Sequence, residues 1–312
     1  MDNRKSVLIT GCSPGGIGHS LALEFQRHGL RVFATARTRN TLTDLKARGV
    51  ETLDLEVDKE QSVLSCRDEI ASLLEGKGLD YLVNNASVQS LFAVTKCYYT
   101  VPALDVDLNE ARQVFETNFF GVIMMCQAFA PLLIEAQGTI VQIGSLAGIL
   151  PYVFGSVYNA SKAALHSFSD TLRAELAPFG VHVTTIITGG VQSRIARVDR
   201  ALSPTSLYQP IRDDYARRVT HSQHGAVPNE VYAKTVVTQI LYGSAPWRWI
   251  WPWSRGPGRK KWIWAGNKAN LIWFLSAGWA WIGLFQWALS RMFNLGKLKR
   301  VFSEERKKAK KL

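Results

Sequence analysis

The feature that most constrains the fold is a regular alternation, over residues 1–245, between short β-branched runs and longer segments with helical periodicity. Runs such as 7–9 and 139–143 lack the polar/apolar alternation of a half-exposed strand, which is typical of parallel strands covered by helices on both faces. The pattern predicts an α/β fold, a doubly wound Rossmann-type parallel sheet. We expect strands over residues 6–10, 31–36, 51–56, 79–84, 138–144 and 181–188, and helices over residues 21–28, 41–48, 61–74, 109–134, 157–177 and 229–242.

Charge and tryptophan content divide the chain at residue 245. Residues 1–245 carry 22 Lys and Arg against 23 Asp and Glu, whereas residues 246–312 carry 15 against 2. All ten tryptophans lie in the second segment. The net charge of +12 therefore arises in the C-terminal segment. We interpret residues 1–245 as a nearly neutral catalytic domain and residues 246–312 as an extension with a different role.

The cysteines restrict the compartment and the chemistry. The four of them include no closely spaced pair, so they predict neither a disulfide framework nor a zinc site. The chain therefore suits a reducing compartment, and we expect no metal. The first residues lead straight into an apolar strand pattern, so we expect no signal peptide.

A glycine-rich turn, TGCSPGGIG at residues 10–18, lies between the first expected strand and the first helix. Glycines let the backbone turn tightly and let a pyrophosphate approach the helix N-terminus, where free N–H groups favour anions. We expect the cofactor phosphates to contact this turn, with Gly15 as an alternative to Gly16. The residues expected to bind are Gly11, Gly16, Ile17 and Gly18.

Arg37 ends the second expected strand, where NAD-binding proteins place an acidic residue against the ribose 2′-hydroxyl. A guanidinium at this point suits the 2′-phosphate of NADP(H), and the plainer alternative is a solvated arginine at a strand end. Asp58 and Asn85 follow the third and fourth strands at the same carboxyl edge of the sheet, where ligands bind. We therefore predict that all three contact the cofactor.

Four further residues form a candidate catalytic constellation. Tyr158 and Lys162 stand at i and i+4, on one face of an expected helix. Ser145 lies 13 residues before Tyr158, just past a strand end, and Asn118 lies 27 residues before Ser145. Each of them alone has an ordinary structural explanation, as a surface pair, a strand-end turn or a polar helix residue. Their order and spacing together make them a candidate site.

With the glycine turn and the Asn-Asn-Ala strand end at residues 84–86, this tetrad makes the chain resemble the short-chain dehydrogenase/reductase family over roughly residues 5–245. The resemblance implies that Tyr158 gives a proton to a carbonyl oxygen while a reduced nicotinamide delivers hydride to the carbon. Ser145 would stabilise the charge on that oxygen, and Lys162 would lower the pKa of Tyr158 and bind the nicotinamide ribose. Asn118 would hold a water that links Lys162 to solvent.

The resemblance also extends to the segment after the last expected strand. Residues 189–227 have no clear period, and we interpret them as a mobile substrate lid. Val191 and Ser193 are expected to contact the nicotinamide carboxamide, although Thr-Gly-Gly at residues 188–190 replaces the Pro-Gly that the family usually has. In this family the long helices around the catalytic residues commonly form dimer faces, so a homodimer is an open expectation.

The C-terminal extension contains an uncharged stretch of 22 residues, 269–290. As a helix it would be about 33 Å long against a hydrocarbon thickness of ~30 Å, so it could span a bilayer or form a re-entrant hairpin. Tryptophan stands at every second position over residues 247–253, with Arg248 between the first two, as in headgroup-level belts, and residues 291–311 add nine basic residues. A buried C-terminal helix or an oligomer interface is the alternative. Nucleic-acid binding does not need a charge-free run of this length, so we expect none.

Within the family, the long glycine turn, Arg37 and the extension resemble the fungal NADPH-dependent 1-acyldihydroxyacetone-phosphate reductases of the endoplasmic reticulum and lipid droplets. The resemblance implies NADP(H) as cofactor, a hydrophobic or lipid ketone as substrate, and a membrane or lipid-droplet surface with the catalytic domain facing the cytosol. Two alternatives stay open. One is a reductase that tailors a polyketide, terpenoid or sterol; the other is a catalytically silent membrane scaffold, which the intact tetrad disfavours.

Overall fold

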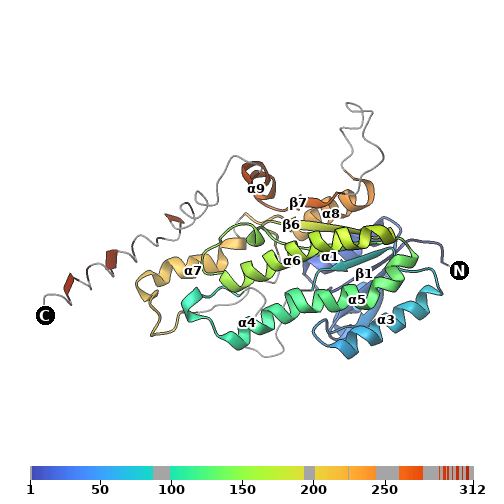
Figure 1. Ribbon diagram of the computed structural model, residues 1–312, viewed down its shortest axis with the longest axis horizontal. Helices are drawn as coiled ribbons and strands as arrows, with labels where there is room; N and C mark the ends of the chain where they lie inside the picture. The colour runs from blue at the N-terminus through green and yellow to red at the C-terminus, as the bar shows by residue number, and fades with distance from the viewer. Residues whose placement is uncertain are drawn as a thin grey trace.

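The computed structural model describes residues 2–86, 99–192, 201–223, 225–243 and 260–276, together with scattered positions between 288 and 308. The described chain forms a seven-stranded parallel sheet with the order β3-β2-β1-β4-β5-β6-β7 (Figure 1). The strands are β1 (Ser6–Ile9), β2 (Arg31–Ala36), β3 (Glu51–Asp54), β4 (Tyr81–Asn84), β5 (Thr139–Ile143), β6 (His182–Thr188) and β7 (Trp262–Ala265). The helices are α1 (Ile17–Arg27), α2 (Thr43–Ala47), α3 (Glu60–Leu74), α4 (Leu108–Phe115), α5 (Gly121–Glu135), α6 (Ser156–Leu176), α7 (Arg212–Thr220), α8 (Asn229–Tyr242) and α9 (Ala269–Ser276).

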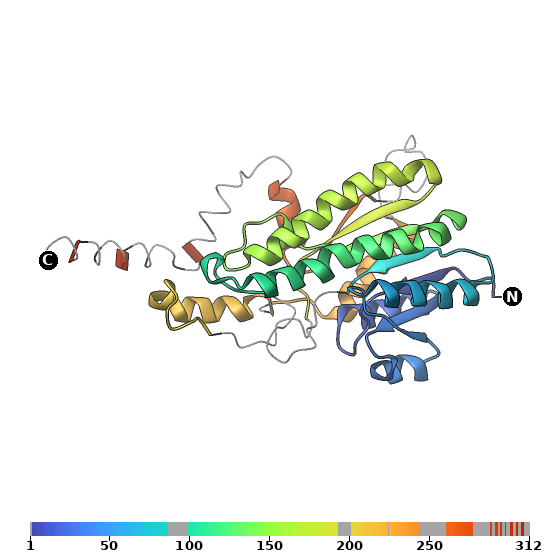
Figure 2. The same ribbon diagram turned by 60° about the horizontal axis from the view of Figure 1, so that its bottom comes forward.

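Helices cover both faces of the sheet, because successive strand residues point to opposite sides and both sides are apolar. In β1, Val7 and Ile9 pack with α1 and α8, whereas Leu8 packs with α3 and α5 on the other face. Figures 1 and 2 both show α5 lying between α3 and α6 on this second face. The predicted doubly wound α/β fold is confirmed.

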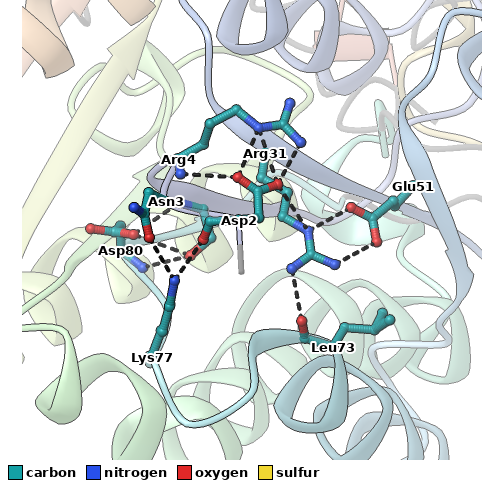
Figure 3. A network of polar contacts seen from close by, with 9 residues as sticks. Asp2, Asn3, Arg4, Arg31, Glu51, Leu73, Lys77 and Asp80 are labelled. Carbon is teal, nitrogen blue, oxygen red and sulfur yellow. Dashed lines mark hydrogen bonds and ion pairs between the residues drawn. The ribbon is translucent and has the colours of Figure 1, made fainter.

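Strand order reverses between β1 and β4, which places a crevice at the carboxyl ends of these two strands. The glycine turn follows β1 at this edge, and the segments with Ser145, Tyr158 and Lys162 follow β5. The opposite edge is tied by a network of charged and polar groups (Figure 3). In that network Arg31 pairs with Glu51, and the Asp80 carboxylate accepts the backbone N–H of Ser6 at 2.8 Å. The charges at the amino edge therefore join the starts of neighbouring strands. The candidate site residues lie at the opposite, carboxyl edge.

The helix expected over residues 109–134 is correct in extent but not in form. It runs from Leu108 to Glu135 as α4, a π-helical turn at Glu116–Phe120, and α5. By length and composition this continuous helix is the described segment that could cross a membrane. Because Val122 and Phe129 are buried between the sheet and α3, we interpret it as a core helix.

The domain boundary predicted at residue 245 is wrong, because the sheet includes a strand beyond it. β7 pairs in parallel with β6, with Ile186 opposite Ile263, so part of the Trp-rich segment completes the fold. Ile263 and Ala265 are buried, whereas Trp262 and Trp264 on the other face of the strand are half-buried. Sequence reasoning misses this strand because Trp262 and Trp264 fall in the Trp-rich extension, which is interpreted there as separate from the catalytic domain.

Part of the segment interpreted as a mobile lid is an ordered helix. α7 packs through Ile211 and Tyr215 against Phe154, and its Arg218 is fully buried, donating from Nε to the carbonyl of Val153 at 2.9 Å. Sequence periodicity missed α7 because its exposed face is strongly polar and its buried face includes an arginine. Residues 193–200 of the same segment lie outside the described residues.

The extension is described only in part. β7 is followed by α9, which covers the first third of the uncharged stretch 269–290. Residues 244–259 and 277–287, which hold the segment 247–253 and half of the uncharged stretch, lie outside the described residues. The predicted transmembrane or hairpin segment therefore stays a prediction.

Candidate active site

Helix α6 carries the Tyr158 and Lys162 pair on its buried face, close to the carboxyl end of β5. Both side chains are buried, and the Lys162 Nζ lies 6.0 Å from the centre of the Tyr158 ring. This ammonium donates to the backbone carbonyl of Ile143 at 2.9 Å. Burial lowers the pKa of Lys162 to about 8. The helix thus holds a cation beside the phenol, whose proton affinity it lowers.

The π-helical turn places Asn118 against the same face of α6. The Asn118 side chain is fully buried and donates from Nδ2 to the Ser161 Oγ at 3.1 Å. The Ser161 hydroxyl in turn donates to the backbone carbonyl of Tyr158 at 2.8 Å. A π-helical turn widens the helix by one residue and is frequent at functional sites. Here it aligns Asn118 with the catalytic turn of α6.

The Asn118 carboxamide oxygen is buried and has no hydrogen-bond partner among the described residues. A buried amide oxygen of this kind ordinarily accepts from an ordered water or a ligand group. The Asn118 oxygen therefore suits an ordered water, and its link to Lys162 stays a prediction.

Ser145 stands at the end of the β5 segment, with an extended backbone, and caps a short 3₁₀ turn at Leu146–Gly148. Its Oγ accepts the backbone N–H of Ala147 at 3.1 Å. This bond uses an oxygen lone pair and leaves the hydroxyl proton available to donate. Ser145 can therefore donate to a ligand oxygen.

The glycine turn has the geometry of an anion cradle. Gly11 has a φ of +72°, and a Cβ at Gly18 would lie 2.5 Å from the Gly11 carbonyl oxygen, so neither position accepts a side chain. Gly16 is the N-cap of α1 and Ile17 its first residue, with no side-chain cap on the helix N-terminus. Gly15, at a φ of +71°, forms the turn before it. The structure thus assigns Gly16 to the helix mouth, where free N–H groups favour phosphate.

Asn85 has a different use from the one expected. Its Nδ2 donates to the backbone carbonyls of Thr10 at 2.8 Å and Gly11 at 3.0 Å. The two segments are also joined in the other direction, since the Thr10 Oγ1 accepts hydrogen bonds from the backbone N–H groups of Asn85 at 3.0 Å and Ala86 at 2.8 Å. Asn85 therefore shapes the glycine turn, and its direct contact with a cofactor stays a prediction.

Two of the residues reported above were missed by the sequence analysis. Thr10 was recognisable as a hydroxyl residue directly before Gly11, and Ser161 as the residue before Lys162 in the Tyr-Asn-Ala-Ser-Lys segment. Both bond to backbone groups of the site, and such bonds have no sequence period that would reveal them.

Arg37 and Asp58 are both exposed at the carboxyl edge. Arg37 makes no ion pair with any described residue, whereas Arg39, two positions later, donates to the Asp54 carboxylate at 2.7 Å. The Arg37 guanidinium is therefore available to an anionic ligand. The role of Asp58 stays a prediction.

The remaining expected cofactor contacts lie after β6. Val191 is buried and forms an isolated bridge with Val227, and Ser193 lies outside the described residues. Gly189 is required by the fold, since a Cβ at this position would lie 2.1 Å from the carbonyl oxygen of Asn267. The described residues contain no group of three side chains suited to hold a metal ion.

Comparison with known proteins agrees with this geometry. The sequence profile of the short chain dehydrogenase family matches residues 5–202. The chain is 38% identical over 308 residues to short-chain dehydrogenase virD of Hypocrea virens, covering 98% of each protein. It is 40% identical over 280 residues to the NADPH-dependent 1-acyldihydroxyacetone phosphate reductase of Schizosaccharomyces pombe, covering 86% of this chain and 88% of the relative.

Solved structures show the same fold. A short-chain dehydrogenase from Streptomyces avermitilis superposes with a TM-score of 0.69 at 23% identity, covering 96% of this chain and 98% of that one. A short chain dehydrogenase from Burkholderia cenocepacia in complex with NADP gives a TM-score of 0.65 at 22% identity, covering 94% and 99%.

Proposed function

Because this chain belongs to the short-chain dehydrogenase/reductase family, we propose that it is an NADPH-dependent carbonyl reductase of a hydrophobic ketone, with 1-acyldihydroxyacetone phosphate as the first candidate substrate. The observation that carries the proposal is the buried pair of Tyr158 and Lys162, joined through Ser161 to Asn118, beside a glycine cradle that admits no side chains. Ketone reduction needs a proton donor and a hydride donor: the phenol can give the proton, and the helix mouth can bind the phosphates of a cofactor that carries the hydride.

Tyr158 acts as the general acid. A free phenol has a pKa near ~10 and gives up its proton poorly at neutral pH. The Lys162 ammonium, 6.0 Å from the ring centre, stabilises the phenolate that forms when the proton leaves. Ser145 donates its hydroxyl proton in a hydrogen bond to the substrate oxygen and stabilises the charge that develops there. Together with hydride addition to the carbonyl carbon, this proton transfer gives an alcohol.

The proton is replaced through Lys162 and Asn118. The Lys162 ammonium donates a hydrogen bond to the Ile143 carbonyl. Its pKa, lowered to about 8, lies near physiological pH, which suits a group that gives and takes up protons. The unpartnered carboxamide oxygen of Asn118 is suited to fix a water next to this group. Asn118 therefore completes a route from solvent to the phenol.

The residues present fit a dinucleotide cofactor. Gly11 and Gly18 allow the tight turn, Gly16 and Ile17 begin α1 with no side-chain cap and so suit a pyrophosphate, and Arg37 offers an uncommitted guanidinium for a 2′-phosphate. Bound NADPH supplies the hydride that adds to the carbonyl carbon. The preference for NADPH over NADH follows from the charge of Arg37.

A hydrophobic substrate is supported by an apolar cluster that lies close to Tyr158 along the chain. Ile211, Tyr215 and Val219 of the α7 segment pack on Phe154, four residues before Tyr158. The relative from Schizosaccharomyces pombe bears the name of a lipid ketone reductase. Both observations favour a ketone with an apolar chain.

Membrane association belongs to the same proposal. In α9, Leu271, Trp273 and Phe274 are each more than half exposed. Lys268 directly precedes this helix, and the chain beyond it carries the nine basic residues of 291–311. Exposed aromatic and aliphatic side chains with flanking cations suit the surface of an endoplasmic reticulum membrane or lipid droplet, with the site facing the cytosol.

The anchor is tested by shortening the chain at a point that leaves β7 in place. A chain that ends at residue 276 keeps all the described strands, whereas one that ends at Tyr242 loses β7. We expect the full chain in the membrane fraction and the chain 1–276 mainly in the supernatant. Sedimentation of the shortened chain with membranes at the full-length level would contradict an anchor beyond residue 276.

The function is tested by a substrate screen with the purified full-length protein. NADPH oxidation is measured with 1-acyldihydroxyacetone phosphate, a sterol ketone, a polyketide ketone and a short water-soluble ketone. We expect the acylated substrate to give the highest kcat/KM. A higher value for the sterol or polyketide would assign the enzyme to a tailoring reaction. No oxidation with any ketone, with a biological role that survives Tyr158→Phe, would favour a silent scaffold.

A further inference from the structure

A buried histidine that the proposed mechanism does not use lies directly behind the catalytic loop. His166 follows Lys162 by one turn of α6 and is only 5% exposed. Its Nε2 accepts the backbone N–H of Ser145 at 3.2 Å. The residue expected to bind the substrate oxygen is therefore held, through its own amide, by a side chain of the helix that carries the proton donor.

The loop around Ser145 is shaped to admit this imidazole. A Cβ at Gly144 would lie 2.4 Å from the His166 Nε2, and a Cβ at Gly148 would lie 2.6 Å from its Cε1. Real Cβ atoms do not approach other atoms so closely, so the ring occupies space that two glycines leave open. The Gly-Ser-Leu-Ala-Gly segment thus follows the outline of the His166 side chain.

The other side of the ring is supported by β7. The Trp262 ring lies 5.5 Å from the His166 ring, centre to centre, at an interplanar angle of 58°. The Trp262 Nε1 donates to the Asp170 carboxylate at 2.9 Å, which fixes the indole one turn further along α6. His166 therefore lies between the catalytic loop and the last described strand of the sheet.

The protonation state suits an acceptor. The pKa of His166 is lowered to about 4, chiefly by burial and also by the nearby Lys162 ammonium, while Asp170 opposes this change. The imidazole is then neutral at physiological pH, and the tautomer that accepts at Nε2 carries its proton on Nδ1. A protonated ring would have no lone pair for the Ser145 amide.

We propose that His166 is a positioning residue, which fixes the Ser145 hydroxyl toward the substrate oxygen by accepting the Ser145 amide from a ring held between Gly144, Gly148 and Trp262. The part of this proposal that gives Ser145 a role in binding substrate rests on the proposed function. The part that concerns the position of the Ser145 loop is independent of that function. The two parts can therefore be tested separately.

The kinetic test compares His166→Leu and His166→Gln with and without Ser145→Ala. In the wild-type background we expect His166→Leu to lower kcat about tenfold with little change in the KM for NADPH, because the loop loses its acceptor. His166→Gln, whose side-chain oxygen can accept, should recover most of this loss. In the Ser145→Ala background the leucine should change kcat by less than about twofold. An equal loss of kcat in both backgrounds would overturn the proposal.

A matched control keeps stability apart from positioning. Ser169→Ala removes another buried hydrogen bond from α6, the one from the Ser169 Oγ to the Leu165 carbonyl at 2.6 Å, and should leave kcat unchanged. If His166→Leu does not fold, His166→Asn repeats the test, because its shorter side chain stays polar but does not reach the amide. A wild-type kcat in either acceptor-free variant would overturn the proposal.

Hydrogen exchange gives a readout that needs no substrate. We expect the backbone amide of Ser145 to exchange at least tenfold faster in the leucine variant than in the wild type, with the glutamine variant in between. Unchanged protection of residues 144–148 would overturn the placement of the loop by His166. If the wild-type protein reduced no ketone while the exchange result held, the proposed function would fail and the positioning of the loop would stand.

Discussion

Lys162 should make folding stability depend on pH in a way that no exposed lysine does. Its pKa is lowered by burial from an ordinary 10.5 to about 8, so between these values the unfolded chain binds more protons than the folded one. Stability must then rise with pH across this window. At pH 7, lowering the pKa from 10.5 to about 8 reduces the free energy of unfolding by about 3 kcal/mol, at about 1.36 kcal/mol for each pH unit.

The quantity to measure is the change in the free energy of unfolding between two pH values, because any loss of stability that is the same at both values cancels. From pH 7 to about pH 9.5, linkage with these two pKa values recovers about 2 kcal/mol of that cost. Lys162→Met removes the titrating group, so the wild type should gain about 2 kcal/mol more than the variant over this interval. Loss of the hydrogen bond to the Ile143 carbonyl lowers the stability of the variant equally at both pH values.

The assay is urea unfolding of full-length protein, without cofactor, at both pH values. Lys234→Met, on the exposed side of α8, is the matched control and should follow the wild type. Lys162→Met should also lower the rate of ketone reduction by at least about a hundredfold. Parallel stability profiles for wild type and Lys162→Met would refute the burial of a charged lysine as the source of its lowered pKa.

Three further changes have defined outcomes. Arg37→Asp should weaken NADPH binding by about 10–100-fold and favour NADH, as measured by fluorescence titration of both cofactors, whereas Arg39→Asp should leave their ratio unchanged. Gly189→Ala places a Cβ 2.1 Å from the Asn267 carbonyl oxygen and should destabilise the protein by about 1–3 kcal/mol in thermal unfolding; an unchanged Tm would contradict the close approach. Phe154→Ala removes the ring on which α7 packs and should make α7 the first site of limited proteolysis, and an unchanged cleavage pattern would show that other contacts hold the helix.

The parts of the fold that follow from hydrophobic pattern were predictable from the sequence. The expected helix over residues 229–242 has those bounds in the structure, because its buried residues, including Tyr232 and Val236, recur at helical spacing. The parallel sheet was predictable because its central strands, β1, β4 and β5, are buried on both faces. The order of its strands follows from right-handed crossovers between parallel neighbours.

Other features depend on contacts between distant segments. β7 is recognisable only by its pairing with β6, because its tryptophans alone equally suit a membrane interface. Buried Arg218 gave α7 a polar sequence, and its partner, the Val153 carbonyl, is far away in the chain. The π-helical turn at Asn118 is also tertiary, since that side chain bonds to Ser161 of α6. Motif spacing located the candidate catalytic residues, but not the polar groups that hold them.

The most direct test of the account is hydride transfer in a single turnover with labelled NADPH and 1-acyldihydroxyacetone phosphate. We expect wild-type protein to place the label on the carbinol carbon of the product, and Tyr158→Phe to slow this step by at least about a hundredfold with unchanged affinity for NADPH. Transfer by Tyr158→Phe at the wild-type rate would contradict the assignment of Tyr158 as the proton donor.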